Sequence, residues 1–269
     1  MSANGANTLP VVRRDEGAVA ILTLNRPAAR NSLSRNMLAA LQALLDTVAA
    51  DTGIRAVVLA AEGPVFCAGH DLKELTARRA DADGGAVFFA DCMAACGAVM
   101  QSVVGLPQPV VAAVQGVATA AGCQLAASCD LVVASSAAKF CTPGVDIGLF
   151  CSTPGVALAR AVPRKSAMEM LLLGEMVPAE DALRMGLVNR VVAPEAVLPT
   201  AISLARQIAA RSAVAVQLGK RGFNAQVGQP LAEAYASAGA VMVENLLAED
   251  AAEGIGAFVD KRRPEWRHR

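Results

Sequence analysis

The chain has 269 residues, of which 54% are hydrophobic and 18% charged, and this size suits one large or two small domains with a substantial core. Its formal net charge at pH 7 is zero and aromatic residues make up only 3%. Neither a basic surface nor a set of stacking platforms is therefore available, which argues against nucleic acid or an anionic membrane surface as a partner.

The cysteines indicate a reduced, metal-free protein. Seven are scattered without a CxxC pair, and only His70 and His268 could join them as imidazole ligands. No spacing typical of a zinc site is present, so no metal is expected. The first residues lack a basic region followed by an apolar run, which argues against a signal peptide. Reduced thiols acting as small apolar residues then predict a cytoplasmic location.

The N-terminal half alternates strand and helix signals. Residues 18–27 (AVAILTLNRP) predict a strand, and Ser34 is a candidate N-cap for a helix whose apolar residues have helical spacing: Met37, Leu38, Leu41, Leu44, Leu45 and Val48. Residues 54–63, 108–116 and 129–135 predict further buried strands, with helices starting at Asp71 and near Gly122. This alternation favours parallel βαβ units with right-handed crossovers.

A long uncharged segment runs from Cys92 to Cys129 and is long enough to suggest a membrane span. It is interrupted by GLPQP and by Gln115-Gly116, so a buried strand between helices is the better interpretation and no membrane partner is expected. From about Pro154 the pattern becomes helical, with one short strand at residues 187–192. We therefore predict an α/β core over residues 1–200 and a helical region over residues 201–269.

Two predicted strand-to-helix junctions are candidates for chemistry. Residues 67–71 (CAGHD) and 119–124 (TAAGCQ) place flexible or tiny residues where the first N–H groups of a helix are free. Two such amides directed at one point would stabilise an oxyanion, although small residues at these turns are also common packing devices. No GxSxG, GxGxxG or GxxxxGK[ST] motif occurs, so a triad hydrolase and a Rossmann or P-loop enzyme are not expected.

Five segments in fixed order resemble the enoyl-CoA hydratase/isomerase family, the crotonase superfamily: LNRPAARNSLS, AEGPVFCAGHDLKEL, QPVVAAVQGVATAAGCQLAASCDLVVAS, GLFCSTPGVALARAVPR and AEDALRMGLVNRVV. The resemblance implies an α/β fold, a crotonase-like spiral of ββα repeats followed by a helical trimerisation region. It also implies an acyl-CoA thioester as substrate, with coenzyme A present only as part of that substrate and no other cofactor. A homotrimer or a dimer of trimers is expected.

By the same resemblance, the backbone amides of His70 and Ala121 form the oxyanion hole. The residues expected to contact coenzyme A are Arg26, Ala68, His70, Asp71, Leu72, Lys73, Phe258 and Lys261. Arg26 would lie near the phosphates, and Phe258 and Lys261 would close the site from a neighbouring subunit. For Arg26 and Lys261 an ordinary solvated charge is the alternative.

The sequence departs from the family at both positions where hydratases carry a glutamate, because Gln124 and Gly144 stand there. Each lost acid–base group typically lowers the rate by about 10²–10⁴, so efficient hydration is not expected. Gln124 can still orient a water or a carbonyl. Asp146 is the nearest carboxylate and would reach the pocket if its segment were extended; a local turn role is the alternative.

Two functional hypotheses result. The first is an enzyme of this family, of the lyase or isomerase class, whose chemistry depends on the oxyanion hole. The second is a non-catalytic acyl-CoA-binding or regulatory protein. A self-compartmentalised serine protease is not supported, because no Ser–His–Asp set can be assembled.

Overall fold

The computed structural model describes residues 9–269 and has two β-sheets at its centre. The larger sheet has the order β1-β2-β3-β5-β7-β10, and all its neighbours are parallel except the β1–β2 hairpin. Its strands are β1 (Val11–Glu16), β2 (Val19–Leu24), β3 (Ala56–Ala61), β5 (Val110–Val114), β7 (Leu131–Ser135) and β10 (Arg190–Val192). The central strands are continuously apolar because helices cover both faces of the sheet.

The smaller sheet has the order β4-β6-β8-β9 and is formed by β4 (Val65–Cys67), β6 (Val117–Thr119), β8 (Lys139–Cys141) and β9 (Val177–Pro178). Each of its first three strands directly follows a strand of the larger sheet along the chain: β3 leads to β4, β5 to β6 and β7 to β8. Each pair of strands is then followed by a helix. The predicted ββα repeat is therefore confirmed.

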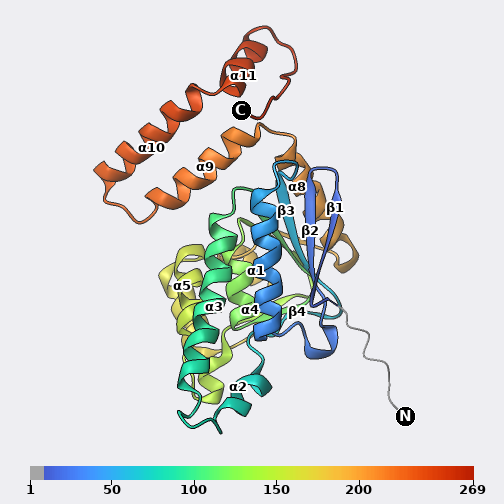
Figure 1. Cartoon of the computed structure of the whole chain (residues 1–269), viewed down its shortest axis with the longest axis vertical. Coiled ribbons are helices and arrows are strands. Elements are labelled where there is room, and N and C mark those ends of the chain that lie inside the picture. Colours follow the sequence, from blue (N-terminus) through green and yellow to red (C-terminus); the bar gives the residue numbers. More distant parts are fainter. Residues whose placement is uncertain (1–8) are drawn as a thin grey trace.

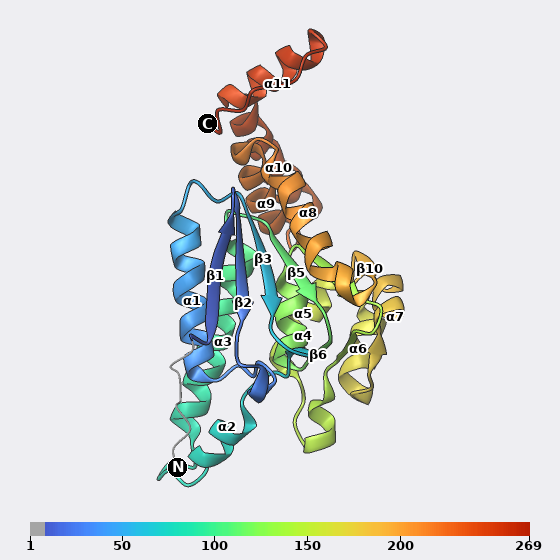
Figure 2. The same cartoon turned by 90° about the vertical axis from the view of Figure 1, so that its right-hand side faces the viewer.

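Helices pack on both faces of the larger sheet (Figure 2). On one face lie α1 (Arg35–Ala50), α3 (Ala86–Gly105), α4 (Ala121–Ser128) and α5 (Ser152–Ala161), and on the other lies α8 (Val197–Ala209). Successive side chains of β3 alternate between the two hydrophobic clusters: Val57 and Leu59 belong to the first, and Val58 to the cluster that α8 completes. The remaining core elements are α2 (Leu72–Arg78), α6 (Arg164–Leu173), α7 (Ala179–Arg184) and the 3₁₀ helices η1 (Pro27–Ala29), η2 (Pro143–Ile147) and η3 (Pro194–Ala196).

Helix α3 is, within residues 9–269, the one helix long and apolar enough to cross a membrane by length and composition. It packs against α1 and α4, and its inward face is buried in the main cluster through Cys92, Cys96, Val99, Met100 and Val103.

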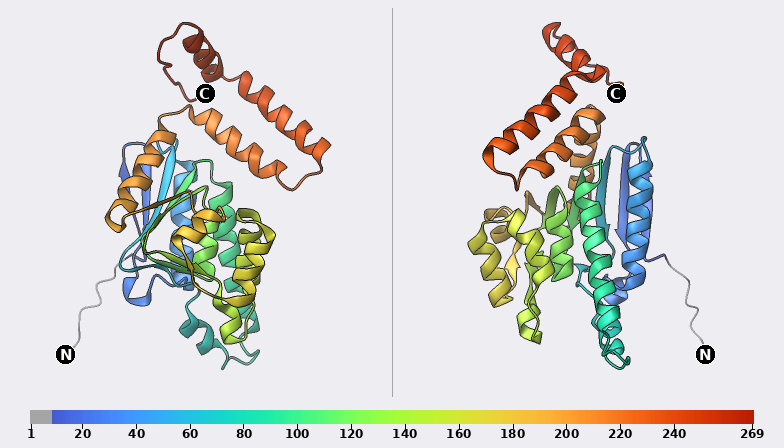
Figure 3. Two further views of the ribbon diagram at one scale, coloured as in Figure 1. Left: turned by 180° about the vertical axis from the view of Figure 1, so that it is seen from behind. Right: turned by 60° about the vertical axis from the view of Figure 1, so that its left-hand side comes forward.

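The C-terminal helices α9 (Ala213–Gln226), α10 (Leu231–Leu246) and α11 (Glu249–Val259) extend away from the two sheets (Figures 1 and 3). They expose large apolar side chains, including Phe223, Leu231, Tyr235, Leu247 and Phe258. Lys220 of α9 anchors them to the core: its Nζ donates to the carbonyls of Val103 and Gln108 and lies 2.6 Å from Asp130 Oδ2. The division at residue 200 stays a prediction.

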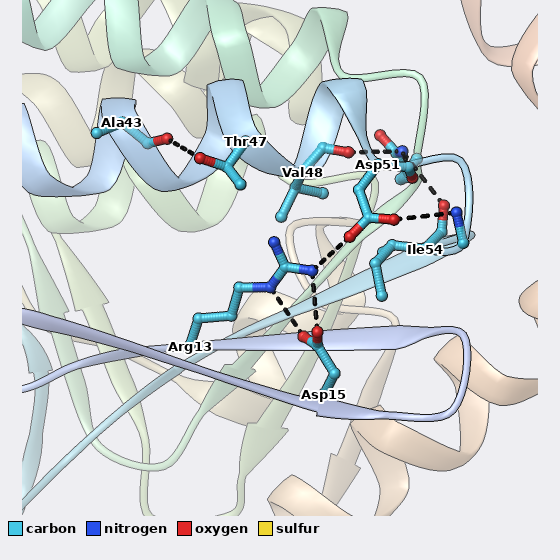
Figure 4. A network of polar contacts seen from close by, with 9 residues as sticks. Arg13, Asp15, Ala43, Thr47, Val48, Asp51 and Ile54 are labelled. Atoms are coloured by element: carbon cyan, nitrogen blue, oxygen red, sulfur yellow. Dashed lines mark hydrogen bonds and ion pairs between the residues drawn. The ribbon is translucent and has the colours of Figure 1, made fainter.

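A polar network fastens the edge hairpin to the end of α1 (Figure 4). The guanidinium of Arg13 on β1 contacts Asp15 at 2.9 Å and Asp51, the residue after α1, at 2.8 Å. The side chain of Gln108 donates to the carbonyls of Val48 and Ile54. These contacts fix the turn after α1 far from the two predicted junctions, so the network is structural.

Candidate active site

The two junctions predicted from the sequence lie against each other. Gly69, just after β4, has a φ of +82°, and a Cβ at this position would lie 2.9 Å from the Ala120 Cβ and 3.2 Å from the Ala121 nitrogen. No side chain fits there, so glycine is required by both conformation and space. The Gly69 carbonyl accepts a hydrogen bond from Leu33 at 2.7 Å, which fixes the loop from its other side.

The second junction carries a strained residue. Ala120 has a φ of 51°, a conformation that costs a non-glycine residue about 1–3 kcal/mol and that clusters at functional sites. Its N–H donates to the Cys141 carbonyl at 2.9 Å, and its carbonyl accepts the backbone N–H of Gln124 at 3.0 Å. Next to it, a Cβ at Gly122 would overlap the Cys67 carbonyl, so β4 and α4 are in backbone contact. The small residues thus bring two main chains together.

The amides of His70 and Ala121 are both available. Ala121 is the first residue of α4, so the helix has no acceptor for its N–H. Neither the His70 N–H nor the Ala121 N–H donates a hydrogen bond to another of residues 9–269. Two free amides on touching loops can bind one oxygen atom that gains negative charge.

The His70 ring is held by α3. Its Nδ1 lies 3.7 Å from the Cys92 Sγ, and its Nε2 is buried without a hydrogen-bond partner in the described chain. Burial lowers the pKa of His70 below its usual value, while the Leu33 carbonyl and the Glu74 charge oppose that shift. Burial also raises the pKa of Cys92. The pair is therefore neutral near pH 7.

Gln124 and Gly144, where the resemblance predicts the two glutamates of hydratases, are both buried. Gln124 is only 4% exposed, and its Oε1 has no hydrogen-bond partner among residues 9–269. At Gly144, a Cβ would lie 2.8 Å from both the Cys151 Sγ and the Leu149 carbonyl oxygen. The backbone around Gly144 thus leaves no room for any side chain. A glutamate at this position would therefore require the loop to move.

Asp146 does not have the geometry on which its predicted role depended. The premise of an extended segment is wrong, because Asp146 lies in the 3₁₀ helix η2. Its side chain is exposed, and Oδ1 would lie 3.5 Å from a Cβ placed on Gly174. A 3₁₀ turn directs residues two apart to different sides, so Gly144 and Asp146 do not share a face.

Most residues predicted to contact coenzyme A lie together along the edge of the molecule where α2 begins. Asp71 caps α2 and accepts from Ser32 Oγ at 3.3 Å, and Ala68 donates its N–H to the Arg30 carbonyl at 3.0 Å. Leu72 and Lys73 follow and are exposed. Arg26 joins this edge: its Nη1 donates to Ser34 Oγ at 2.7 Å, and its Nη2 lies 3.7 Å from Asp71 Oδ2.

Phe258 and Lys261 are not brought to this edge within one chain. Phe258 is 85% exposed on α11, and Lys261 follows the end of that helix. Figure 1 places α11 and α2 at opposite ends of the molecule. Their contribution from a neighbouring subunit stays a prediction.

Three buried thiols lie near the second junction: Cys123 in α4, Cys141 at the end of β8 and Cys151 in the loop after η2. Burial raises the pKa of Cys123, Cys141 and Cys151, and none of residues 9–269 places a cation beside them that would stabilise a thiolate. They act as apolar packing. Within residues 9–269 no cluster of three or more His, Cys, Asp or Glu side chains is arranged to hold a metal ion.

Sequence reasoning missed Arg35, the first residue of α1, which lies above the ring of Phe88. One signal for it was present. A cation at a helix N-terminus is unfavourable for the helix dipole, so the presence of Arg35 at the start of α1 indicates a role other than helix stability.

The comparisons with known proteins agree with this geometry. The enoyl-CoA hydratase/isomerase family matches residues 14–269. An enoyl-CoA hydratase of Mycobacterium smegmatis shares 50% identity and superposes with a TM-score of 0.91, covering 96% of this chain and 98% of the other. The chain belongs to the enoyl-CoA hydratase/isomerase family and has the crotonase fold, as the sequence predicted.

Within the family, segments such as GLFCSTPGVALARAVPRK resemble the enoyl-CoA hydratase domain-containing protein 3 group, and this resemblance is confirmed. The crystal structure of the human protein of that name is 46% identical, covers 96% of this chain and all of the other, and has a TM-score of 0.90. The rat protein is 46% identical over 255 residues, which are 95% of this chain and 83% of the relative.

The expected cytoplasmic location is contradicted. The rat and human relatives are both named mitochondrial. The prediction was wrong because reduced cysteines and a neutral net charge reflect the redox state and the surface of a folded protein. They do not determine its subcellular location.

Proposed function

We propose that this protein binds an acyl-CoA thioester and polarises its carbonyl through the N–H groups of His70 and Ala121. The observation that carries the proposal is the contact of the two junctions, in which a Cβ on Gly69 would lie 3.2 Å from the Ala121 nitrogen. Family membership supports the substrate class. Coenzyme A enters as part of the substrate, and the chemistry requires no separate cofactor.

The reaction belongs to the lyase or isomerase class of the family, but it is not efficient hydration. Hydration needs one group to accept a proton and another to donate one. An amide at Gln124 and a bare backbone at Gly144 supply neither. What remains is stabilisation of an enolate-like oxygen by the two amides, with Gln124 orienting a water or a substrate oxygen.

The second candidate is a non-catalytic acyl-CoA-binding or regulatory protein. One observation favours it: Gln124 and Gly144 carry no ionisable group, and Asp146 is exposed in η2. In this case the oxyanion amides serve only to hold the thioester.

Single-turnover incubation with enoyl-, 3-oxo- and malonyl-type CoA thioesters separates the two candidates. Conversion of any member supports an enzyme, and saturable binding without conversion supports a binding protein. Absence of binding to every thioester contradicts both.

The oxyanion amide is tested by Ala121→Pro. Proline removes the N–H and is accepted at the first position of a helix, but it also restricts Ala120, whose ψ is −119°. The melting temperature of Ala121→Pro must therefore match that of the wild type before the rates are compared. We expect loss of about 10²–10³ in rate, or a corresponding loss of thioester affinity if no turnover occurs. Arg164→Pro is the matched control, because Arg164 is the exposed first residue of α6 and takes no part in the proposed site. Equal activity of Ala121→Pro and the control would contradict the proposed oxyanion hole.

We also propose a homotrimer or a dimer of trimers in which Phe258 and Lys261 complete a neighbouring site. The large apolar side chains exposed on α9, α10 and α11 support association, since a lone chain would leave them in water. Light scattering tests the state directly. A stable monomer would contradict it.

A further inference from the structure

One face of α3 lies against two polar side chains from other elements. Phe88 and Cys92 are four residues apart, so they share this face about one helical turn, ~5.4 Å, apart. The His70 Nδ1 is 3.7 Å from the Cys92 Sγ, and the Arg35 guanidinium carbon is 5.8 Å from the Phe88 ring centre. The ring of His70 and the guanidinium of Arg35 are therefore neighbours along α3.

Both side chains have buried nitrogen atoms without partners. His70 Nε2 and Arg35 Nη1 are buried and make no hydrogen bond with any of residues 9–269. Arg35 forms no ion pair in the described chain. An unmade hydrogen bond of a buried polar group typically costs about 1–3 kcal/mol, and more for a charged one. Such a cost is offset when a ligand supplies the acceptor.

Charged groups of both signs lie around this part of α3. A second guanidinium, that of Arg78, lies 5.0 Å from the Phe88 ring, and its ion pair with Asp81 spans 4.0 Å. The carboxylate nearest to Arg35 is Glu74, whose Oε2 accepts the backbone N–H of Arg35 at 3.0 Å and so caps α1. Two guanidinium groups and two carboxylates thus lie here, and Glu74 is already engaged by the first turn of α1.

Both unpaired nitrogens can act as hydrogen-bond donors. The contact between Nδ1 and Sγ fits a Cys92 S–H that donates to Nδ1, because a neutral imidazole nitrogen is a better acceptor than a thiol. The proton of the neutral ring then resides on Nε2. The guanidinium donates at every nitrogen. Two donors, one of them on a guanidinium without an ion pair among residues 9–269, match a carboxylate.

We infer that Arg35 and the His70 ring, set against Phe88 and Cys92 of α3, form a subsite for a carboxylate at the far end of the acyl chain. The substrates would then be CoA thioesters of dicarboxylic acids. This inference rests on the proposed function, because the chain is directed to α3 only when its carbonyl lies on the His70 amide. His70 would bind the carbonyl through its backbone and the carboxylate through its ring. Cys92 is a positioning residue that sets the ring tautomer.

Calorimetric titration of the full-length protein tests the inference with pairs of ligands matched in length: glutaryl-CoA against pentanoyl-CoA, and malonyl-CoA against propionyl-CoA. We expect the carboxylated member to bind about tenfold to a hundredfold more tightly at one length at least, as for a charged hydrogen-bonded group. Equal affinities at both lengths would overturn the inference while leaving the proposed function intact. Absence of binding by all four would overturn both.

Arg35→Met should reduce this preference to nearly one, and Arg35→Lys should retain part of it, since lysine keeps the charge but not the planar fork. Arg79→Met is the matched control. Arg79 lies 5.8 Å from the ring of Phe89, the same distance as Arg35 from Phe88, but Phe89 is on the adjacent face of α3. We expect Arg79→Met to keep the wild-type preference. A preference retained by Arg35→Met would overturn the assignment.

The tautomer is measured separately by nitrogen NMR with labelled histidine. The chain has two histidines, His70 and His268, so the signals can be assigned with His70→Phe. We expect the neutral ring of His70 to carry its proton on Nε2, and Cys92→Ala to shift the Nδ1 signal. Cys96→Ala, one turn further along α3, should leave it unchanged. A proton found on Nδ1 would overturn the role of Cys92.

Discussion

Replacing Gly144 tests whether the loop around it has room for a side chain, as a hydratase glutamate would require. A Cβ at this position would lie 2.8 Å from the Leu149 carbonyl oxygen and 2.8 Å from the Cys151 Sγ, closer than real Cβ atoms approach such neighbours. The carbonyl belongs to the backbone, which cannot move as a side-chain tip can. Even Gly144→Ala should therefore cost about 1–3 kcal/mol through overpacking.

Thermal unfolding measures this cost. For a chain of this size, each kcal/mol lowers the melting temperature by about 2–4 °C, so Gly144→Ala should unfold at a clearly lower temperature. Gly97→Ala is the control, because Gly97 lies inside α3 and its nearest neighbour would be 4.0 Å away. Alanine is the better helix former, so this control should gain up to about 1 kcal/mol.

The same argument predicts that hydration cannot be restored by returning the glutamates. Gln124→Glu combined with Gly144→Glu should still leave crotonyl-CoA unhydrated, because the second side chain has no space in the present loop. The loss of enoyl thioester absorbance is the assay. The reasoning would be refuted if Gly144→Ala had the same melting temperature as the wild type and the double variant hydrated crotonyl-CoA roughly 10²–10⁴-fold faster, the gain that a restored acid–base group supplies.

Three further predictions concern the rest of the chain. Lys220→Met should lower the free energy of unfolding by about 1–3 kcal/mol in denaturant titrations, because it removes the cation paired with Asp130 and the donor to two carbonyls. Ellman titration should find the native thiols slow and all seven reactive after unfolding, since burial raises the pKa of Cys67 and of Cys96 to about 12. Because the pKa of His70 is lowered in the folded chain, the unfolded chain binds this proton first as the pH falls. The free energy of unfolding should therefore keep its highest value above about pH 6.5 and decrease below it. The decrease should be smaller in His70→Phe.

The sequence was informative wherever local chemistry decides the structure. Ser34 caps α1 as predicted, with its Oγ accepting the Met37 N–H at 3.2 Å, and the apolar residues at helical spacing face the core. The strand predicted at residues 54–63 is β3, and the small residues of the two junctions do bring main chains into contact. Hydrophobic period and capping are properties of a few adjacent residues, so they can be predicted without a structure.

Contacts between distant segments could not be predicted in the same way. Whether a side chain fits at Gly144 depends on the path of residues 149–151, and the face of Asp146 depends on η2 being a 3₁₀ helix. Arg35, His70 and Cys92 come from three elements and meet only because α3 packs between them. No spacing in the sequence encodes such a meeting, and burial alone reveals that two of their nitrogens lack partners.

The missing glutamates and the unpaired cation lead to one last prediction, on Gln124→Glu. A carboxylate at Gln124 would repel a carboxylate on the acyl chain by about 2 kcal/mol at a separation of about 8 Å, taking an effective dielectric constant near 20. Gln124→Glu should therefore weaken the binding of glutaryl-CoA roughly thirtyfold and that of pentanoyl-CoA much less. The difference between the two affinities should shrink as salt is added. Gln124→Leu removes the amide without adding charge and separates repulsion from the loss of a hydrogen bond. If Gln124→Glu weakened both thioesters equally, the absence of glutamate here would have no connection with an anionic acyl group, and only the loss of hydratase chemistry would explain it.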